Sequence, residues 1–243
     1  MKKKISELKE LIRKLLENDF LSDLFVPIHK TGYPFIVIFF IVSLILGTIS
    51  SLLGWLGIIL TIWCIYFFRD PVRYTPSTKN HIISPADGKI ISIIDADLPK
   101  EFNEKKQMKK ISIFMNVFNV HVNRIPIDGK IKSLNYIPGA FFNASLDKAS
   151  EKNERMLITM GFNGKDNLYF TQIAGLIARR IKCDLNIDQS VKAGEKFGII
   201  RFGSRVDLYL PTDYEIEVLK GQTVIGGETK IASTKKLKSP KNI

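Results

Sequence analysis

Cysteine and histidine are scarce in this chain. Its 243 residues include two cysteines, Cys64 and Cys183, and three histidines, His29, His81 and His121. Nothing in the sequence suggests that the cysteines pair, which fits a reducing cytosolic face. The histidines are too dispersed for a familiar metal-ligand spacing. We therefore expect no metal.

Motifs of nucleotide and nucleic-acid binding are also missing. The chain has no glycine-rich phosphate loop, dinucleotide fingerprint or nucleophile elbow, and no recognition helix or clustered basic and aromatic face. Its net charge of +12 is spread along the chain, and the tail after Glu228 carries lysines and no acid. Such a tail is more often a solvated end than a contact with a charged surface. We expect no nucleic-acid partner, and an anionic membrane surface is the polyanion that remains.

Charge is absent from one long segment. Residues 35–68 contain no charged residue and are mostly Ile, Leu, Val, Phe and Trp, whereas about 20 apolar residues already span a bilayer. Small residues cluster in the middle and predict two short helices joined by a bend. Lys30 precedes the run and Arg69 and Arg73 follow it, so both ends stay in the cytoplasm. Residues 31–73 are thus predicted to form a membrane hairpin on the cytoplasmic face of the cell (inner) membrane. A cleaved signal peptide is not expected, since the apolar run begins too late.

Residues 1–30 form a separate amphipathic segment. Apolar residues recur at helical spacing on one face, with Lys and Glu on the other; they are Ile5, Leu8, Ile12, Leu15 and Leu16. This helix could pack on the protein. It could equally lie on the lipid surface, where its lysines and arginine would meet anionic headgroups.

Residues 74–243 are β-rich. Short strand-like runs cover residues 89–94, 110–115, 130–136, 156–162 and 168–173, with Gly-containing turn pairs between them. Only residues 144–153 have a helical pattern. The prediction is a mainly β protein: an antiparallel barrel or sandwich, preceded by the N-terminal helix and the hydrophobic hairpin.

Within this β region, Gly203 and Ser204 stand between two strand-like pieces, residues 198–201 and 206–210. The pair therefore predicts a bend. A tightly held Gly-Ser peptide can also cut itself. The serine hydroxyl attacks the preceding carbonyl, and elimination from the resulting ester leaves a pyruvoyl group at the serine position. An isolated Gly-Ser is far more often an ordinary turn.

Three other polar residues are candidates for chemistry, each with a simpler alternative. Asp87, in Ser84-Pro-Ala-Asp-Gly88, could cap a turn. His121 lies in the strand-like run Asn119-Val-His-Val-Asn-Arg-Ile-Pro126 and could be a hydrogen-bonded structural histidine. Arg124 could clamp a carboxylate or phosphate, or form a surface ion pair.

Five motifs together resemble a known family. Phe67-Phe-Arg-Asp-Pro71, the Asp87 turn, the His121 run, Gln172-Ile-Ala-Gly175 and Phe202-Gly-Ser-Arg205 occur in this order. The order is similar to that of the phosphatidylserine decarboxylase proenzymes, and specifically to a short archaeal-type branch also found in bacteria. The resemblance covers residues 21–219.

The resemblance implies a specific chemistry. The chain would cut itself between Gly203 and Ser204, and the pieces 1–203 and 204–243 would stay associated. Ser204 would become the covalent pyruvoyl cofactor, which forms a Schiff base with phosphatidylserine and accepts the electrons released with CO2. The product would be phosphatidylethanolamine. The resemblance leaves a homo-oligomer open.

It also suggests roles for the polar candidates. Asp87 and His121 would act with Ser204 in self-cleavage, as in a serine-protease triad, and Arg124 is the candidate for substrate binding. Longer relatives carry two histidines three apart in this strand, and the second takes the triad role. Here that second position is Arg124, which stays protonated and is a poor base. Either His121 takes both roles or another group does.

Two rival functions remain at this stage. Residues 82–90 and 191–198 also resemble the two halves of biotinyl- and lipoyl-type barrels, which would make the chain a non-catalytic membrane-anchored adaptor. That reading leaves Gly203-Ser204 unexplained and predicts an uncut chain. The other rival is a pyruvoyl enzyme for a soluble amino acid, for which the hairpin has no purpose.

Overall fold

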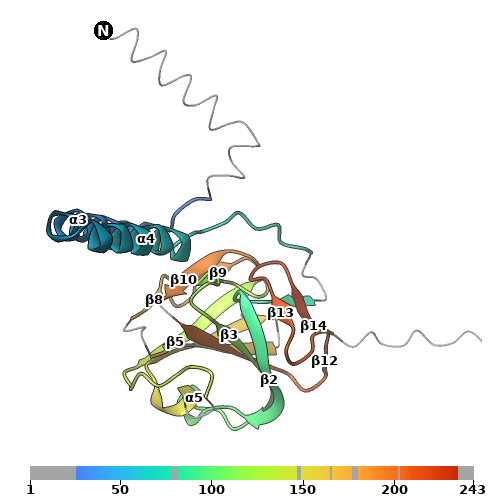
Figure 1. The fold of residues 1–243 in the computed structure, drawn as a ribbon. Coiled ribbons are helices and arrows are strands. Elements are labelled where there is room, and N and C mark those ends of the chain that lie inside the picture. The colour runs from blue at the N-terminus through green and yellow to red at the C-terminus, as the bar shows by residue number, and fades with distance from the viewer. Residues whose placement is uncertain are drawn as a thin grey trace, which may run out of the picture. The chain divides into compact units, whose positions relative to one another are not determined.

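The computed structural model describes residues 26–77, 81–146, 149–164, 166–176, 180–201 and 203–234. Most of the predicted amphipathic segment 1–30 and the basic tail lie outside these residues. The chain divides into two compact units, Met1–Val72 and Arg73–Ile243. Figure 1 shows a pair of helices and a curled, strand-rich domain.

The first unit is a helical hairpin. A 3-10 turn, η1 (Lys30–Gly32), leads into α3 (Tyr33–Ile49), and α4 (Ser51–Phe67) follows directly. Ser50 alone joins the helices, in extended conformation. The predicted pair of helices with a bend in the small-residue cluster is therefore confirmed.

Small residues allow the two helices to approach closely. A Cβ on Gly57 would lie 2.5 Å from the Cβ of Ser43, and a Cβ on Gly54 would lie 2.8 Å from the Cα of Gly47. Small residues at such crossings are typical of helix pairs in lipid, where close van der Waals packing replaces the hydrophobic effect.

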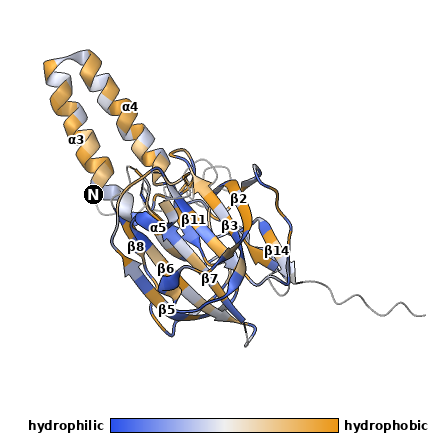
Figure 2. Ribbon diagram, turned by 90° about the horizontal axis from the view of Figure 1, so that it is seen from below, coloured by the Kyte–Doolittle hydropathy of each residue, from blue (hydrophilic) through white to orange (hydrophobic). Residues whose placement is uncertain are grey.

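The outer surface of the hairpin is apolar. Large apolar side chains such as Ile49, Trp55 and Ile59 are more than half exposed, and Figure 2 shows both helices in the colour of hydrophobic residues. The segment Lys30–Ile49 is long and apolar enough to cross a membrane, and Ser51–Phe67 is a shorter apolar helix. Each 17-residue helix is about 26 Å long at 1.5 Å per residue, close to the ~30 Å hydrocarbon core of a bilayer.

The second unit is an antiparallel β domain, so the predicted fold class is confirmed. Its main sheet has eight strands in the order β13-β2-β3-β11-β7-β6-β5-β9. In chain order these are β2 (Gly88–Asp97), β3 (Gln107–Met115), β5 (Gly129–Ile137), β6 (Arg155–Phe162), β7 (Asp166–Ile173), β9 (Ser190–Val191), β11 (Ser204–Leu210) and β13 (Thr223–Val224).

Two three-stranded sheets complete the domain. One has the order β1-β14-β12 and the other β4-β10-β8. Their strands are β1 (His81–Ile83), β4 (Val122–Arg124), β8 (Ile181–Cys183), β10 (Lys196–Ile200), β12 (Tyr214–Ile216) and β14 (Lys230–Thr234). Short helical pieces, η2 (Lys100–Phe102) and α5 (Ala149–Lys152), lie in the connections.

Strand β11 is buried on both faces. Val206, Leu208 and Leu210 belong to the main core inside the curled sheet. Tyr209 belongs to a second, smaller core on the other face, with Phe102 and other residues. Because side chains alternate along a strand, the side chain of Ser204 shares the face of Val206, inside the main core.

The structure differs from the sequence prediction at two connections. The predicted helix 144–153 is the four-residue α5 (Ala149–Lys152). Asn153 ends it because its side-chain amide donates to the carbonyls of Phe142 and Ala174, which ties the segment to the sheet as a loop. Ser204 is not in the bend but is the first residue of β11.

Candidate active site

Gly203 forms a left-handed turn immediately before β11. Its φ is +65°, and a Cβ at this position would meet nothing within 4 Å. Glycine is therefore favoured by the backbone conformation and not by lack of space, because a left-handed φ is strained for residues with a Cβ. The Gly203–Ser204 peptide thus links a left-handed turn to a strand.

The His121 ring contacts this turn directly. The backbone N–H of Gly203 donates to Nε2 of His121, at 3.2 Å, and Nδ1 lies 3.0 Å from the carbonyl oxygen of Asn119. An Nε2 that accepts carries a lone pair, so the proton is assigned to Nδ1, which donates to Asn119. His121 is fully buried. The structure therefore places the accepting nitrogen of the His121 ring at the N–H of Gly203, one peptide before the Gly203–Ser204 bond.

Gly175 packs against the carbonyl group of Gly203. A Cβ on Gly175 would lie 1.8 Å from the Gly203 oxygen and 3.5 Å from the Cβ of Ala144. Only glycine leaves room for that carbonyl. The last residue of the Gln172-Ile-Ala-Gly175 motif thus fixes the position of the carbonyl that Ser204 would attack.

Two buried amide side chains, Asn123 and Gln172, lie near Ser204. The Ser204 Oγ contacts the Met115 sulfur at 3.9 Å, and the side-chain amide of Asn123 contacts the same sulfur at 3.6 Å. Nε2 of Gln172 donates to Oδ1 of Asn123 at 2.8 Å. Ser204, Asn123 and Gln172 are all fully buried, and Oε1 of Gln172 has no hydrogen-bond partner among the described residues.

Arg205, next to Ser204, is held on the opposite face of β11. Its guanidinium pairs with the Asp207 carboxylate at 2.8 and 2.9 Å, and Lys110 approaches the same carboxylate at 3.2 Å. Arg205 also donates to the carbonyls of Ala144 and Leu146. Because this buried guanidinium is paired with a carboxylate and also binds two carbonyls, it fixes the start of β11.

Asp87 lies in a turn of its own. Its carboxylate pairs with Arg73 at 2.6 Å and accepts the backbone N–H of Gly226 at 2.7 Å. The carboxylate thus binds a backbone N–H of a distant segment, and the Ser84 hydroxyl makes hydrogen bonds within the Ser84–Gly88 turn. The contacts described here connect Asp87 with Arg73 and Gly226, whereas His121 contacts Gly203.

Arg124 is buried and does not lie on the surface. Its Nη1 donates to the carbonyl of Gly194 at 2.9 Å, and its side chain is so close to Gly227 that a Cβ there would lie 2.7 Å from Cδ. Since Gly226 binds Asp87, Arg124 and Asp87 meet at the same turn. This turn adjoins β4, which begins immediately after His121.

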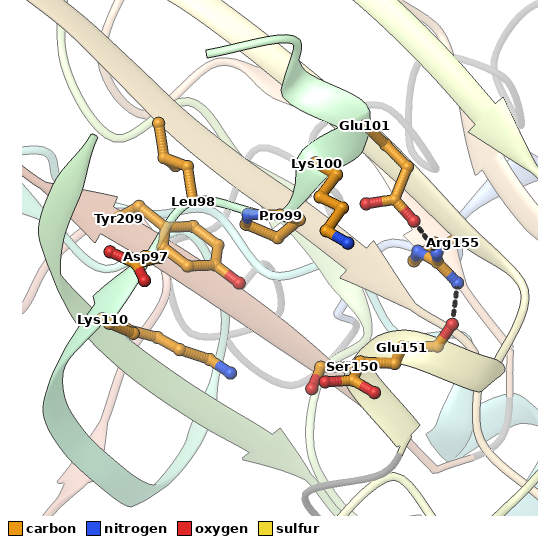
Figure 3. Close-up of a pocket in the computed structure, with 11 residues that line it drawn as sticks. Asp97, Leu98, Pro99, Lys100, Glu101, Lys110, Ser150, Glu151, Arg155 and Tyr209 are labelled. Atoms are coloured by element: carbon orange, nitrogen blue, oxygen red, sulfur yellow. Dashed lines mark hydrogen bonds and ion pairs between the residues drawn. The ribbon is translucent and has the colours of Figure 1, made fainter. Parts of the chain in front are cut away.

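A cavity of about 510 Å³ lies elsewhere in the domain (Figure 3). Its polar lining includes Lys100, Lys110 and Tyr209, and Arg155 pairs there with Glu101. Tyr209 and Ser204 point to opposite faces of β11, so this cavity is separate from the Ser204 site. Among the described residues, no three His, Cys, Asp or Glu side chains are placed to hold a metal ion.

Comparison with known proteins identifies the family. The sequence model described as phosphatidylserine decarboxylase matches residues 60–232. A phosphatidylserine decarboxylase proenzyme of Rickettsia typhi is 56% identical over 212 residues, which are 87% of this chain and 92% of that protein. Proteins of the same name from Rickettsia bellii and Rickettsia felis are 56% and 55% identical, with the same coverage. The chain belongs to the phosphatidylserine decarboxylase family.

The family match includes every residue of the site described above. From the sequence alone, no role could be assigned to Gly175, Asn123 or Gln172, or to the Arg205–Asp207 pair. Gln172 and Asn123 each lie in one of the quoted motifs, but nothing in the sequence indicates that their side chains meet in the fold. The contact between Gly175 and Gly203 joins distant segments and has no local signal.

Proposed function

We propose that this chain is the uncut precursor of a phosphatidylserine decarboxylase. It cuts itself between Gly203 and Ser204 and then converts phosphatidylserine to phosphatidylethanolamine and CO2. The observation that carries the proposal is the hydrogen bond from the Gly203 N–H to the basic nitrogen of His121, directly beside a buried serine, in a chain of this family.

In self-cleavage, the Ser204 hydroxyl oxygen attacks the carbonyl carbon of Gly203, and its proton passes to Nε2 of His121. The C–N bond breaks and an ester joins residues 203 and 204. Removal of the Ser204 α-proton then breaks the Cβ–O bond and frees the Gly203 carboxylate. Water replaces the nitrogen left at position 204, ammonia departs, and the ketone of a pyruvoyl group remains.

The residues present fit this pyruvoyl group. Ser204 has the left-handed Gly203 on its amino side, and Gly175 leaves room for the carbonyl that is released. When formed, the ketone supplies an acceptor for the substrate amine and for the electron pair left by CO2. The amide of Asn123 and the Ser204 hydroxyl contact the same Met115 sulfur, and Asn123, Gln172 and Ser204 are all fully buried.

The two pieces, 1–203 and 204–243, stay associated in this proposal. Strand β11 begins at Ser204 and pairs with β3 over seven residue pairs and with β7 over five. Its apolar side chains are buried in the main core. A cut on the amino side of Ser204 leaves these contacts in place.

Asp87 and Arg124 take supporting roles. Asp87 holds Arg73 and the turn at Gly226, against which Arg124 packs. Arg124 lies three residues after His121 and carries a fixed positive charge. We assign substrate binding to Arg124, through the carboxylate or phosphate of the headgroup, and proton handling with His121 to Asp87.

The domain roles follow the same proposal: 1–30 as an amphipathic helical segment, 31–73 as the membrane hairpin and 74–243 as the catalytic domain. A two-chain lipid leaves the bilayer at high cost, since each buried methylene contributes ~0.8 kcal/mol. The apolar hairpin keeps the enzyme where its substrate is, on the cytoplasmic face if the flanking Lys30 and Arg69 set the orientation.

Assignment to the short archaeal-type branch is also part of the proposal. It is supported by Arg124 at the position of the second histidine. It is also supported by relatives of similarly short length, of which the aligned 212 residues are 92%. Those relatives are bacterial.

The direct test is CO2 release from phosphatidylserine labelled in the serine carboxyl group and presented in vesicles. The purified chain should release label, and the Ser204→Ala variant should release none. Release from free serine at a comparable rate would favour the soluble amino-acid enzyme. No release from a folded, cut chain would refute the assigned substrate.

A further inference from the structure

Four large apolar side chains are exposed on loops around Gly203. Phe118 is 60% exposed, Leu176 66%, Leu146 45% and Phe142 36%. We refer to these four residues as the apolar rim. Single exposed apolar residues are common on proteins, but several gathered around one site mark an interaction surface.

Two of the rim residues adjoin direct contacts with Gly203. Phe118 lies three residues before His121, whose ring accepts the Gly203 N–H. Leu176 directly follows Gly175, which packs against the Gly203 carbonyl. Both side chains are therefore held within a few residues of the peptide that is cut.

The other two rim residues are tied to the same place by side-chain hydrogen bonds. Asn153 donates to the carbonyls of both Phe142 and Ala174, at 2.8 and 2.7 Å. Arg205 donates to the carbonyl of Leu146 at 3.1 Å. The three loops that carry the rim thus converge on the start of β11.

Two arginines add positive charge to this surface. Arg201 lies two residues before Gly203, and Arg180 is exposed at the start of β8. Burial lowers the pKa of Arg201, and the nearby charge of Arg180 lowers it further. Ile200 pairs with Ile181 across β10 and β8, so the adjoining Arg201 and Arg180 lie opposite each other and together would attract an anionic surface.

We propose that the apolar rim, with Arg180 and Arg201, docks the β domain onto an anionic phospholipid bilayer. The inference rests on the proposed function, because a lipid substrate must pass from the bilayer to Ser204, which is fully buried. When Phe118 and Leu176 enter the bilayer, the membrane surface reaches the loops that cover the site. The occupant is lipid, since apolar side chains flanked by arginines match acyl chains beneath anionic headgroups.

Site-directed spin labelling tests the docking without relying on activity. The full-length chain carries Ser204→Ala, so that it stays uncut, and serine at Cys64 and Cys183. A nitroxide is then attached through Phe118→Cys, Leu176→Cys or Ile187→Cys. Ile187 is a matched control because it is 58% exposed and lies at the other end of the sheet. The N–H of its neighbour Asp188 donates to the carbonyl of Ile131. Ile131 pairs with Met160 at the end of β5 and β6 that lies away from Ser204.

In vesicles of equal parts phosphatidylserine and phosphatidylcholine, labels at 118 and 176 should collide mainly with oxygen, which concentrates in lipid. The label at 187 should collide mainly with a neutral nickel chelate, which stays in water. In vesicles of phosphatidylcholine alone, immersion at 118 and 176 should decrease. Equal exposure of all three labels to the nickel chelate would overturn the proposal. Equal immersion of labels 118 and 176 in both kinds of vesicle would also overturn it.

A kinetic test uses the self-cleaving chain. Phe118→Ser and Leu176→Ser should each raise the KM for vesicle phosphatidylserine roughly tenfold, as expected from losing part of one buried apolar side chain. Ile187→Ser should leave it unchanged, and all three should cut themselves at the normal rate. An unchanged KM in the rim variants would contradict docking. If the parent chain lacks decarboxylase activity, the proposed function fails while the labelling result still decides the docking.

Discussion

The backbone N–H of Gly203 donates to Nε2 of His121, so the ring contacts the residue before the scissile bond. Its accepting nitrogen is held at the N–H of Gly203, and Nδ1 is directed to the carbonyl of Asn119. The contact holds the left-handed turn, and in the proposed self-cleavage the same nitrogen would release this N–H and take the Ser204 proton.

Two variants of His121 separate these roles. In His121→Gln, the side-chain oxygen can still accept the Gly203 N–H, but the base is lost; self-cleavage should slow by about 10²–10⁴-fold. His121→Phe removes both and should also loosen the turn. The measurement is the rate at which the uncut chain disappears on a denaturing gel. Normal cleavage in His121→Gln would show that another group takes the proton.

Gly175→Ala should prevent self-cleavage and destabilise the domain, because the new Cβ would lie 1.8 Å from the Gly203 oxygen. Gly203→Ala is the matched control: its Cβ has open space, so only the left-handed strain of about 1–2 kcal/mol remains. Thermal unfolding and the cut fraction of both variants provide the comparison. Normal self-cleavage of the Gly175→Ala chain would contradict the claim that Gly175 fixes the position of the Gly203 carbonyl.

Asp207→Asn should lower the free energy of unfolding by about 3–5 kcal/mol, because it leaves Arg205 buried beside Lys110 without its carboxylate. The control is Asp184→Asn, whose pair with Lys182 is partly exposed and should contribute less than about 1 kcal/mol. Urea unfolding in the uncut Ser204→Ala background gives both values. Equal effects would mean that burial of the Arg205–Asp207 pair does not matter for stability.

Tyr169 predicts a loss of stability at alkaline pH. Burial, together with its hydrogen bond to Glu104, raises the pKa of this phenol to about 12, above the ordinary value near 10. The neutral phenol therefore contributes stability that is complete below pH ~10 and is lost as pH rises toward 12.

Urea midpoints of the uncut chain, measured across this range, should fall more steeply than those of Tyr169→Phe. Burial also raises the pKa of Tyr214 to about 12. The comparison with Tyr169→Phe is therefore needed to isolate the contribution of Tyr169. Parallel curves for the two chains would contradict the assignment.

Local patterns in the sequence were enough to predict much of the fold. The uncharged run gave two helices with Ser50 between them, and turn pairs separated the main strands. Strand β11 was harder to delimit at its start, because its apolar alternation begins only at Val206 and a Gly-Ser pair is typical of a bend. Its first residue, Ser204, was assigned to the bend for that reason.

The site was only partly predictable. Gly203, Ser204 and His121 could be selected from sequence, and the structure brings them together. The amide pair of Asn123 and Gln172 could not, because β4 and β7 meet only in the folded domain. Asp207 resembled an ordinary surface acid, since nothing nearby in sequence except Arg205 indicates that it is buried with a partner.

The central claim is self-cleavage at Gly203–Ser204, and intact-mass spectrometry of the purified chain beside Ser204→Ala tests it most directly. We expect two fragments from the parent chain, residues 1–203 and residues 204–243 beginning with a pyruvoyl group, and one uncut mass from the variant. A single uncut mass from folded parent protein would contradict the account and favour the non-catalytic adaptor.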